Sequence, residues 1–438
     1  MSSSGPAATS ISPLHTAQRT DLRFVDSLLS KVQWKVDLSM SPTPMPRNHD
    51  SRDPLKFPWA ALLALAAAGF LAIFTETIPA GLLPQLSAGL DISESSAGQL
   101  VSLYAIGSLL AAIPLVAATR HMSRKNVLLT AVLTLLVFNT VTALAPWYPL
   151  ILAARFIAGA AAALVWGVLA GYARGLVPTE QQGRALTVTG IGQPIALAAG
   201  VPLGALAGTL VDWRWVFVAI SLAAAGLAAW IATAVPDVPS QAPSVHLPLR
   251  RVILMPGIRP VLIVALVWVL AHNILYTYIA PLLEPTGLRL ELGLALFGVA
   301  SFLGITAAGA IIDRALRATV LSVLTLMAVA SLALANPMLG TWVVSFAIAL
   351  WGFSFGGAPA LLQTALADRA GEHTDAAQSV FVTVFNLAVA SGGIIGGAML
   401  SAASSTSVLA WVAVVLVLAA FMMAILSRKA FSPGRRST

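Results

Sequence analysis

The sequence predicts an all-α membrane protein with about twelve transmembrane helices in two pseudo-symmetric six-helix bundles. Of its 438 residues, 58% are hydrophobic and 10% are charged, whereas an average soluble domain has about 25% charged residues. From Trp59 onward, apolar stretches of about 20 residues, the length of helix that crosses a bilayer, alternate with short polar breaks. Features of the first half also recur in the second half.

The apolar stretches divide the chain into parts. Residues 1–56 are rich in Ser, Pro and Thr, and we expect a disordered cytoplasmic tail there, in which Met40 or Met45 is an alternative start. We expect one bundle over 57–235, a cytoplasmic linker over 236–258, a second bundle over 259–430 and a short tail over 431–438. The expected helices lie near 59–84, 97–118, 127–145, 149–173, 185–210, 214–235, 260–283, 293–312, 318–336, 340–366, 377–402 and 408–427.

The distribution of Lys and Arg predicts the orientation. One set of breaks holds only Arg214 and Arg289. The other set is basic, and short basic loops remain cytoplasmic. We therefore expect both termini in the cytoplasm of a bacterial cell, with the protein integral to the inner membrane and no nucleic acid as partner. The basic set contains Arg120, Arg124, Lys125, Arg174, Arg184, Arg250, Arg251, Arg314, Arg317 and Arg369.

The two halves contain matching residues. Asp313 and Arg317 follow Arg120 and Arg124 by 193 positions, and Gly392 and Gly396 follow Gly200 and Gly204 by 192. A near-constant separation of distant pairs indicates internal duplication. Duplicated six-helix units are typical of alternating-access transporters, which bind their substrate near the midplane between the units.

Several motifs together resemble a known family. They are Phe74-Thr75-Glu76 to Leu83-Pro84, the basic loop Arg120 to Lys125, Arg155 to Gly159, a glycine run ending at Gly208, Asp212 to Trp215, and Asp313-Arg314. Over about residues 57–430 the chain is identified as a member of the major facilitator superfamily. It is similar to the drug:proton antiporters of the arabinose-efflux and chloramphenicol-efflux types.

The resemblance implies a proton-coupled exporter of a drug, sugar or metabolite that works as a monomer in lipid, without cofactors. The alternative within transport is an uptake symporter. The sequence has no G-x-x-x-x-G-K-[ST] loop, so the energy comes from an ion gradient. No His, Asp and Glu cluster has metal-site spacing, and the short loops lack the polar groups of a membrane enzyme. A receptor has no supporting feature.

Charge inside a membrane is costly and usually functional. Counting 1.5 Å per residue, Glu76 lies roughly 24 Å from the cytoplasmic end of its helix and Arg155 roughly 9 Å from the outer end of its own. Because the family places these helices together beside the central cavity, we predict that Glu76 carries the coupling proton and is held near Arg155 when deprotonated. His272 is the next candidate. The alternatives are a permanent ion pair and, for His272, a hydrogen bond between helices.

Two groups of residues are candidates for conformational control. In the family's signature loop, Arg120 replaces the usual Asp beside Arg124, whereas the second copy keeps Asp313 with Arg314. Such an acid beside Arg can lock one conformation, although these charges also set topology. In the fifth helix, Gly200 and Gly204 belong to a run spaced every four residues, and Pro202 adds a bend. This run resembles the antiporter signature and favours export, although ordinary helix packing has the same spacing.

Substrate contacts are expected near the midplane. Polar and aromatic side chains at this depth can line a pocket for a flat ligand, although aromatic residues also face lipid. The candidates are Phe74, Gln193, Asn273, Tyr276 and Asn386.

Overall fold

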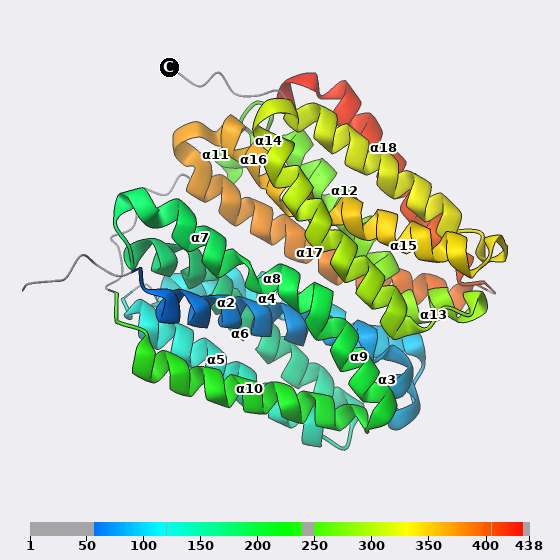
Figure 1. Cartoon of the computed structure of the whole chain (residues 1–438), viewed down its shortest axis with the longest axis horizontal. Helices are drawn as coiled ribbons and strands as arrows, with labels where there is room; N and C mark the ends of the chain where they lie inside the picture. The colour runs from blue at the N-terminus through cyan, green and yellow to red at the C-terminus, as the bar shows by residue number, and fades with distance from the viewer. Residues whose placement is uncertain (1–56, 120, 239–248, 404, 432–438) are drawn as a thin grey trace, which may run out of the picture. The chain divides into compact units, whose positions relative to one another are not determined.

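The computed structural model describes residues 57–119, 121–238, 249–403 and 405–431. Twelve helical segments in this part are long and apolar enough to cross a membrane (Figure 1). Each matches one predicted span, in the same order along the chain, so the all-α fold with twelve transmembrane helices is confirmed. The predicted tail over 1–56 lies outside the described residues.

The first bundle contains six spans. The fifth is divided into α7, α8, the π-helical turn η2 and α9. The helices are α2 (Trp59–Gly81), α3 (Leu83–Leu90), α4 (Glu94–Thr119), α5 (Arg124–Leu144), α6 (Tyr148–Gly175), α7 (Gln182–Gly190), α8 (Gly192–Ile195), η2 (Ala196–Gly200), α9 (Val201–Leu210) and α10 (Trp213–Ala234).

The second bundle also contains six spans, two of which are continuous in α14 and are separated by non-helical backbone at Ala315. The helices are α12 (Ile258–Thr277), α13 (Ile279–Leu283), α14 (Leu290–Leu334), α15 (Thr341–Gly356), α16 (Ala358–Ala370), α17 (Thr374–Ala402) and α18 (Ser407–Leu426). A further short helix, α11 (Leu249–Ile253), lies within the predicted linker.

The exterior of the helices is apolar. Trp342 is 89% exposed, Leu210 is 76% exposed and Phe346 is 69% exposed. In water such a surface would drive aggregation, but in a bilayer it contacts acyl chains. The exposed apolar surface therefore indicates, as composition did, that lipid surrounds these helices.

Helix contacts repeat between the bundles. In the first bundle α4 packs on α6 so closely that a Cβ on Gly159 would collide with the carbonyl oxygen of Tyr104. In the second, α14 packs on α15 in the same way, at Gly356 and Ser301. Gly356 follows Gly159 by 197 positions, and Ser301 follows Tyr104 by the same number (356 − 159 and 301 − 104). The internal duplication predicted from the sequence is thus present in the packing.

The same shift reveals a difference between the bundles. Arg155, which contacts Leu100, corresponds to Gly352, which contacts Phe297, because 352 − 155 and 297 − 100 both equal 197. Glycine in the second bundle allows the backbones of α14 and α15 to meet, whereas the first bundle places a guanidinium at that point. The second bundle therefore has no charged side chain at the position equivalent to Arg155.

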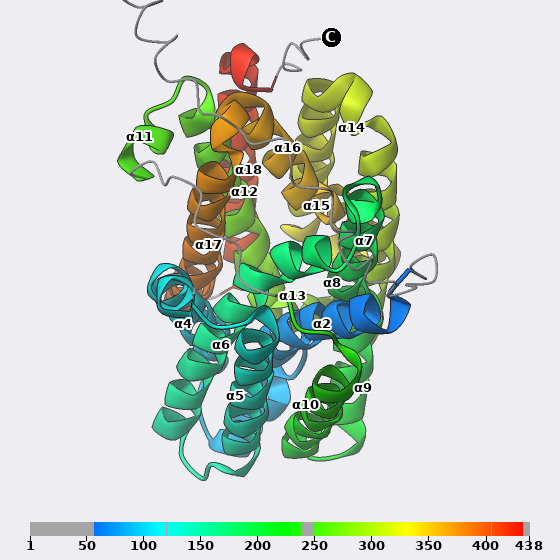
Figure 2. The same ribbon diagram turned by 90° about the vertical axis from the view of Figure 1, so that its left-hand side faces the viewer.

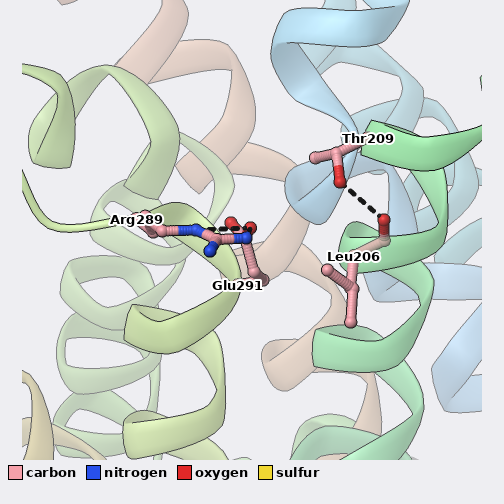
Figure 3. A network of polar contacts seen from close by, with 4 residues as sticks. All are labelled: Leu206, Thr209, Arg289 and Glu291. Atoms are coloured by element: carbon pink, nitrogen blue, oxygen red, sulfur yellow. Dashed lines mark hydrogen bonds and ion pairs between the residues drawn. The ribbon is translucent and has the colours of Figure 1, made fainter.

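The two Arg residues in the set of breaks that otherwise lacks Lys and Arg both bind partners nearby. Arg214 Nη1 donates to the carbonyl oxygens of Ala143 and Ala145 at the end of α5, at 2.8 Å each. Arg289 pairs with Glu291 at the start of α14, opposite Leu206 and Thr209 of α9 (Figure 3).

The bundles meet along two pairs of helices. The start of α4 lies beside the end of α17, and η2 and α9 lie beside α14 (Figure 2). At Gly298 in α14 the bundles approach so closely that a Cβ would collide with the carbonyl oxygen of Leu197. The helices at the interface between the bundles include α2, α4, α9, α12, α14 and α17.

Candidate functional site

A buried arginine joins three helices of the first bundle. Arg155 in α6 has no exposed surface. Its Nε donates to the carbonyl oxygen of Leu100 in α4 at 3.2 Å, and its Nη2 donates to the carbonyl oxygen of Glu76 in α2 at 3.3 Å. Its Nη1 is buried without a hydrogen-bond partner among the described residues. A buried guanidinium is costly and is retained mainly where it has a function.

Tyr104 supports this arginine and was missed by the sequence reasoning. The Arg155 guanidinium carbon lies 4.6 Å from the centre of the Tyr104 ring, within the range of a cation–π interaction. The Tyr104 hydroxyl donates to the carbonyl oxygen of Ala72 at 2.9 Å. Arg155 and Tyr104 therefore hold the backbone of α2 at residues one helical turn apart. The available signal was that Tyr104 is the only aromatic residue of α4.

The predicted meeting of Glu76 and Arg155 involves the backbone of Glu76. Its carboxyl is partly buried and, among the described residues, makes neither an ion pair with Arg155 nor a hydrogen bond. Because the arginine is bound to main-chain carbonyls, its position does not depend on the charge of the carboxyl. This geometry leaves the carboxyl able to gain or lose a proton while the three helices stay joined.

The glycine face of the fifth span packs on α2. A Cβ on Gly200 would lie 3.0 Å from the Phe70 ring, and a Cβ on Gly204 would lie 2.5 Å from Ile78 and 3.0 Å from Phe74. The helix widens to a π-turn over Ala196–Gly200, immediately before Pro202, and such turns are frequent at functional sites. Gly200 and Gly204 thus border the helix that carries Glu76, and Pro202 lies between them in the sequence.

His272 lies in an aromatic cluster of the second bundle. Its ring stacks on Phe355 with centroids 3.4 Å apart, and Tyr276 and Phe297 lie within 5.6 Å. Its Nδ1 accepts a hydrogen bond from the Trp351 indole at 3.2 Å. An indole nitrogen only donates, so in this arrangement Nδ1 carries no proton. The geometry favours a helix-to-helix hydrogen bond for His272 over the transfer of a proton.

The five predicted substrate contacts are divided between the bundles. Phe74 on α2 and Gln193 on α8 are partly buried. Asn273 on α12 and Asn386 on α17 are buried, and each amide donates to a carbonyl of its own helix. Tyr276 is buried in the aromatic cluster, and its hydroxyl has no hydrogen-bond partner in the described part of the chain. That hydroxyl is the one group among the five with an unused buried donor.

The basic residues near the helix ends bind the ends of neighbouring helices. Lys125 donates to the carbonyl oxygen of Ala232 in the last turn of α10 at 2.8 Å, and Arg317 donates to that of Ile425 in the last turn of α18 at 3.1 Å. Cations at a helix C-terminus interact favourably with its dipole. The repeated loops therefore contact equivalent helices in the two bundles.

The structure describes only some of the predicted gating residues in the two charged loops. Arg124 begins α5 and its side chain passes over Gly171 of α6. Arg314 is exposed. Arg120 and the side chain of Asp313 lie outside the described residues, so the role predicted for them stays a prediction.

Comparisons with known proteins agree with this picture. The family model described as Major Facilitator Superfamily matches residues 65–392. A chloramphenicol efflux pump of Mycobacterium tuberculosis is 30% identical over 362 residues, which cover 78% of this chain and 87% of the pump. The purine ribonucleoside efflux pump NepI of Shigella sonnei is 27% identical over 370 residues, covering 83% of this chain and 93% of that protein.

A solved structure shares the fold. The crystal structure of a D-xylose-proton symporter superposes with a TM-score of 0.69 at 16% sequence identity, covering 87% of this chain and 100% of the symporter. At this identity the likeness concerns the arrangement of the helices alone.

Proposed function

Since the chain belongs to the major facilitator superfamily, we propose that it exports a small organic molecule in exchange for protons by alternating access. The family makes the chain an integral multi-pass transporter of small molecules and not an enzyme. The proposal adds a direction of transport, a coupling ion and a coupling group.

The direction is supported by two observations. The relatives that match most of the chain include pumps named for the efflux of chloramphenicol and of purine ribonucleosides. The glycine face of the fifth span, typical of antiporters by its resemblance, packs directly on α2 at Gly200 and Gly204. A change in the packing of this face would displace the helix that carries Glu76.

The observation that carries the coupling proposal is the contact between Arg155 and Glu76. The arginine is held by the carbonyls of Leu100 and Glu76, and the carboxyl of Glu76 has no partner among the residues that the structure describes. We assign this arrangement to the protonated state of the carboxyl, released from Arg155. Loss of the proton would create an anion beside a guanidinium whose Nη1 has no acceptor in the described part of the chain. The new attraction would draw the two side chains together.

This movement links the proton to the conformational cycle. A proton from outside neutralises Glu76, releases the carboxyl from Arg155 and favours the inward-facing state. Release of the proton to the cytoplasm restores the ion pair and favours the outward-facing state, which delivers the substrate outside. Arg155 stays charged throughout, so the carboxyl performs the switching.

Transport into inverted membrane vesicles tests the direction and the coupling ion. Chloramphenicol and a purine ribonucleoside are the first probes. We expect vesicles with an acidic lumen to accumulate a substrate, and accumulation to stop when an ionophore removes the pH gradient. Accumulation only when the lumen is alkaline would contradict export and support the uptake symporter.

A further inference from the structure

Tyr278 of the second bundle is inserted against the first turns of α4 in the first bundle. It lies between α12 and α13 and has no exposed surface. Its hydroxyl lies 2.7 Å from the carbonyl oxygen of Gly393 in α17 and 3.3 Å from that of Ser95 in α4. The one hydroxyl proton is thus shared between carbonyls of both bundles, with the shorter distance to Gly393 in its own bundle.

Two further hydrogen bonds cross between the bundles at the same place. Ser95 Oγ donates to the carbonyl oxygen of Gly397 at 2.8 Å, and Gln99 Nε2 donates to that of Gly393 at 3.3 Å. Ser95 and Gln99 are one turn apart on α4, so they form a row of donors facing α17. The carbonyls of α17 are reachable because glycines leave this part of the helix without side chains.

Glycines also create the space for the Tyr278 ring. A Cβ on Gly98 would collide with the Tyr278 hydroxyl. A Cβ on Gly396 would lie 2.8 Å from the ring, and one on Gly397 would lie 2.5 Å from the hydroxyl oxygen. Three glycines from two bundles therefore surround one tyrosine, and a methyl group at any of them would push the helices apart.

The position along the helices identifies which end is held. Ser95 lies in the first turn of α4, just after the short helix α3 that follows α2, and Gly397 lies near the end of α17. The Lys and Arg distribution puts these helix ends outside the cytoplasm. The contacts thus join the bundles at the outer end.

We propose that Tyr278, Ser95 and Gln99 form a latch, here named the Tyr278 latch, that keeps the outer end of the transporter closed. Alternating access requires the bundles to separate at this end, so all three hydrogen bonds must break in each cycle. The net contribution of one neutral hydrogen bond to stability is small. The latch can therefore bias the conformation without preventing its change.

The absence of cysteine from the sequence permits a direct test. Ser102→Cys introduces a single thiol about one turn deeper than Gln99 on α4. Ser102 is buried, and its hydroxyl has no partner among the described residues, so the exchange removes no hydrogen bond to any of them. A membrane-impermeant maleimide added outside intact cells labels this thiol only when the outer end is open.

Tyr278→Phe in this background removes the hydroxyl and keeps the ring. We expect the labelling rate to rise about three- to tenfold, the change in population that corresponds to the loss of one hydrogen bond. Tyr148→Phe is the matched control, because Tyr148 also donates to a carbonyl in the first turn of α4, that of Ser96, at 2.7 Å, but within the first bundle. Tyr148→Phe should leave the labelling rate unchanged.

A steric pair of variants gives an independent measurement. Gly397→Ala should also speed labelling from outside, because the methyl group displaces the Tyr278 hydroxyl. Gly226→Ala is the control, since a Cβ there meets nothing within 4 Å. If Tyr278→Phe does not reach the membrane, the comparison of Gly397→Ala with Gly226→Ala still tests the latch.

Equal labelling rates for Tyr278→Phe and Tyr148→Phe, or for the two alanine variants, would overturn the latch. Faster labelling only when the reagent is on the cytoplasmic side would overturn its assignment to the outer end. The measurement uses neither substrate nor pH gradient. A failure of the proposed proton coupling would therefore leave the result of this experiment unaffected.

Discussion

Arg155 Nη2 donates to the backbone carbonyl of Glu76 at 3.3 Å, so these two residues of opposite charge meet through the main chain of α2. The guanidinium is fixed by that carbonyl, by the carbonyl of Leu100 and by the ring of Tyr104. The carboxyl of Glu76 is left to change its protonation state. The predictions for this site follow from this difference: the guanidinium of Arg155 is fixed in place, and the carboxyl of Glu76 is not.

Arg155→Lys should reduce transport driven by a pH gradient by about tenfold or more, since hydrogen bonds from a charged donor contribute about 1.5–3 kcal/mol. Lysine places its charge at one point and cannot reach the carbonyls of Leu100 and Glu76 with a planar fork. Initial uptake rates in inverted vesicles measure the effect. Arg184→Lys is the control, because Arg184 lies at the surface against Phe57 and Trp59. Full activity of Arg155→Lys would show that transport does not need the planar guanidinium.

Gly200→Leu and Gly204→Leu should each reduce transport about tenfold or more while the protein still inserts, since overpacking typically costs 1–3 kcal/mol. The added side chain would meet Phe70 at the first position and Ile78 and Phe74 at the second. Gly226→Leu is a matched control at a position with no neighbour within 4 Å. Uptake per molecule of inserted protein is the measurement. Normal uptake by both variants would indicate that this face does not contact α2 during transport.

A reporter that is active only in the cytoplasm should work when it is fused after Arg436 or inserted in the 236–258 linker. The reason is the concentration of Lys and Arg in one set of breaks. A reporter active only outside the cytoplasm serves as the control at the same positions. Its activity at either position would reverse the predicted orientation, and the Tyr278 latch would then lie at the cytoplasmic end.

The transmembrane spans could be predicted from the sequence because their signal is local. A run of about 20 apolar residues identifies a span without knowledge of its neighbours. The subdivision of the fifth span at Ala196–Gly200 could not be predicted in this way, because a π-turn depends on one extra residue in the hydrogen-bond pattern. The short helix α11 within the predicted linker was also missed.

The residues of the site could be predicted from the sequence, but the contacts between them could not. The rarity of charge in apolar stretches was enough to select Glu76 and Arg155. Which atom of Glu76 the arginine binds depends on side-chain rotamers and on the depth of each helix to within about a turn, and the sequence specifies neither. Tyr278 was missed because its partners Ser95 and Gly393 lie 183 and 115 positions away along the chain.

The most direct test of proton coupling is to record proton movement in proteoliposomes that contain a pH-sensitive dye. In the wild-type protein, addition of a transported substrate should move protons in the opposite direction. Glu76→Gln should still insert and bind substrate, because Arg155 contacts only the backbone at this position, but its substrate-induced proton signal should disappear. Glu180→Gln, which changes an exposed acid before α7, should keep the signal. A proton signal of wild-type size from Glu76→Gln would contradict the account and place the coupling group elsewhere.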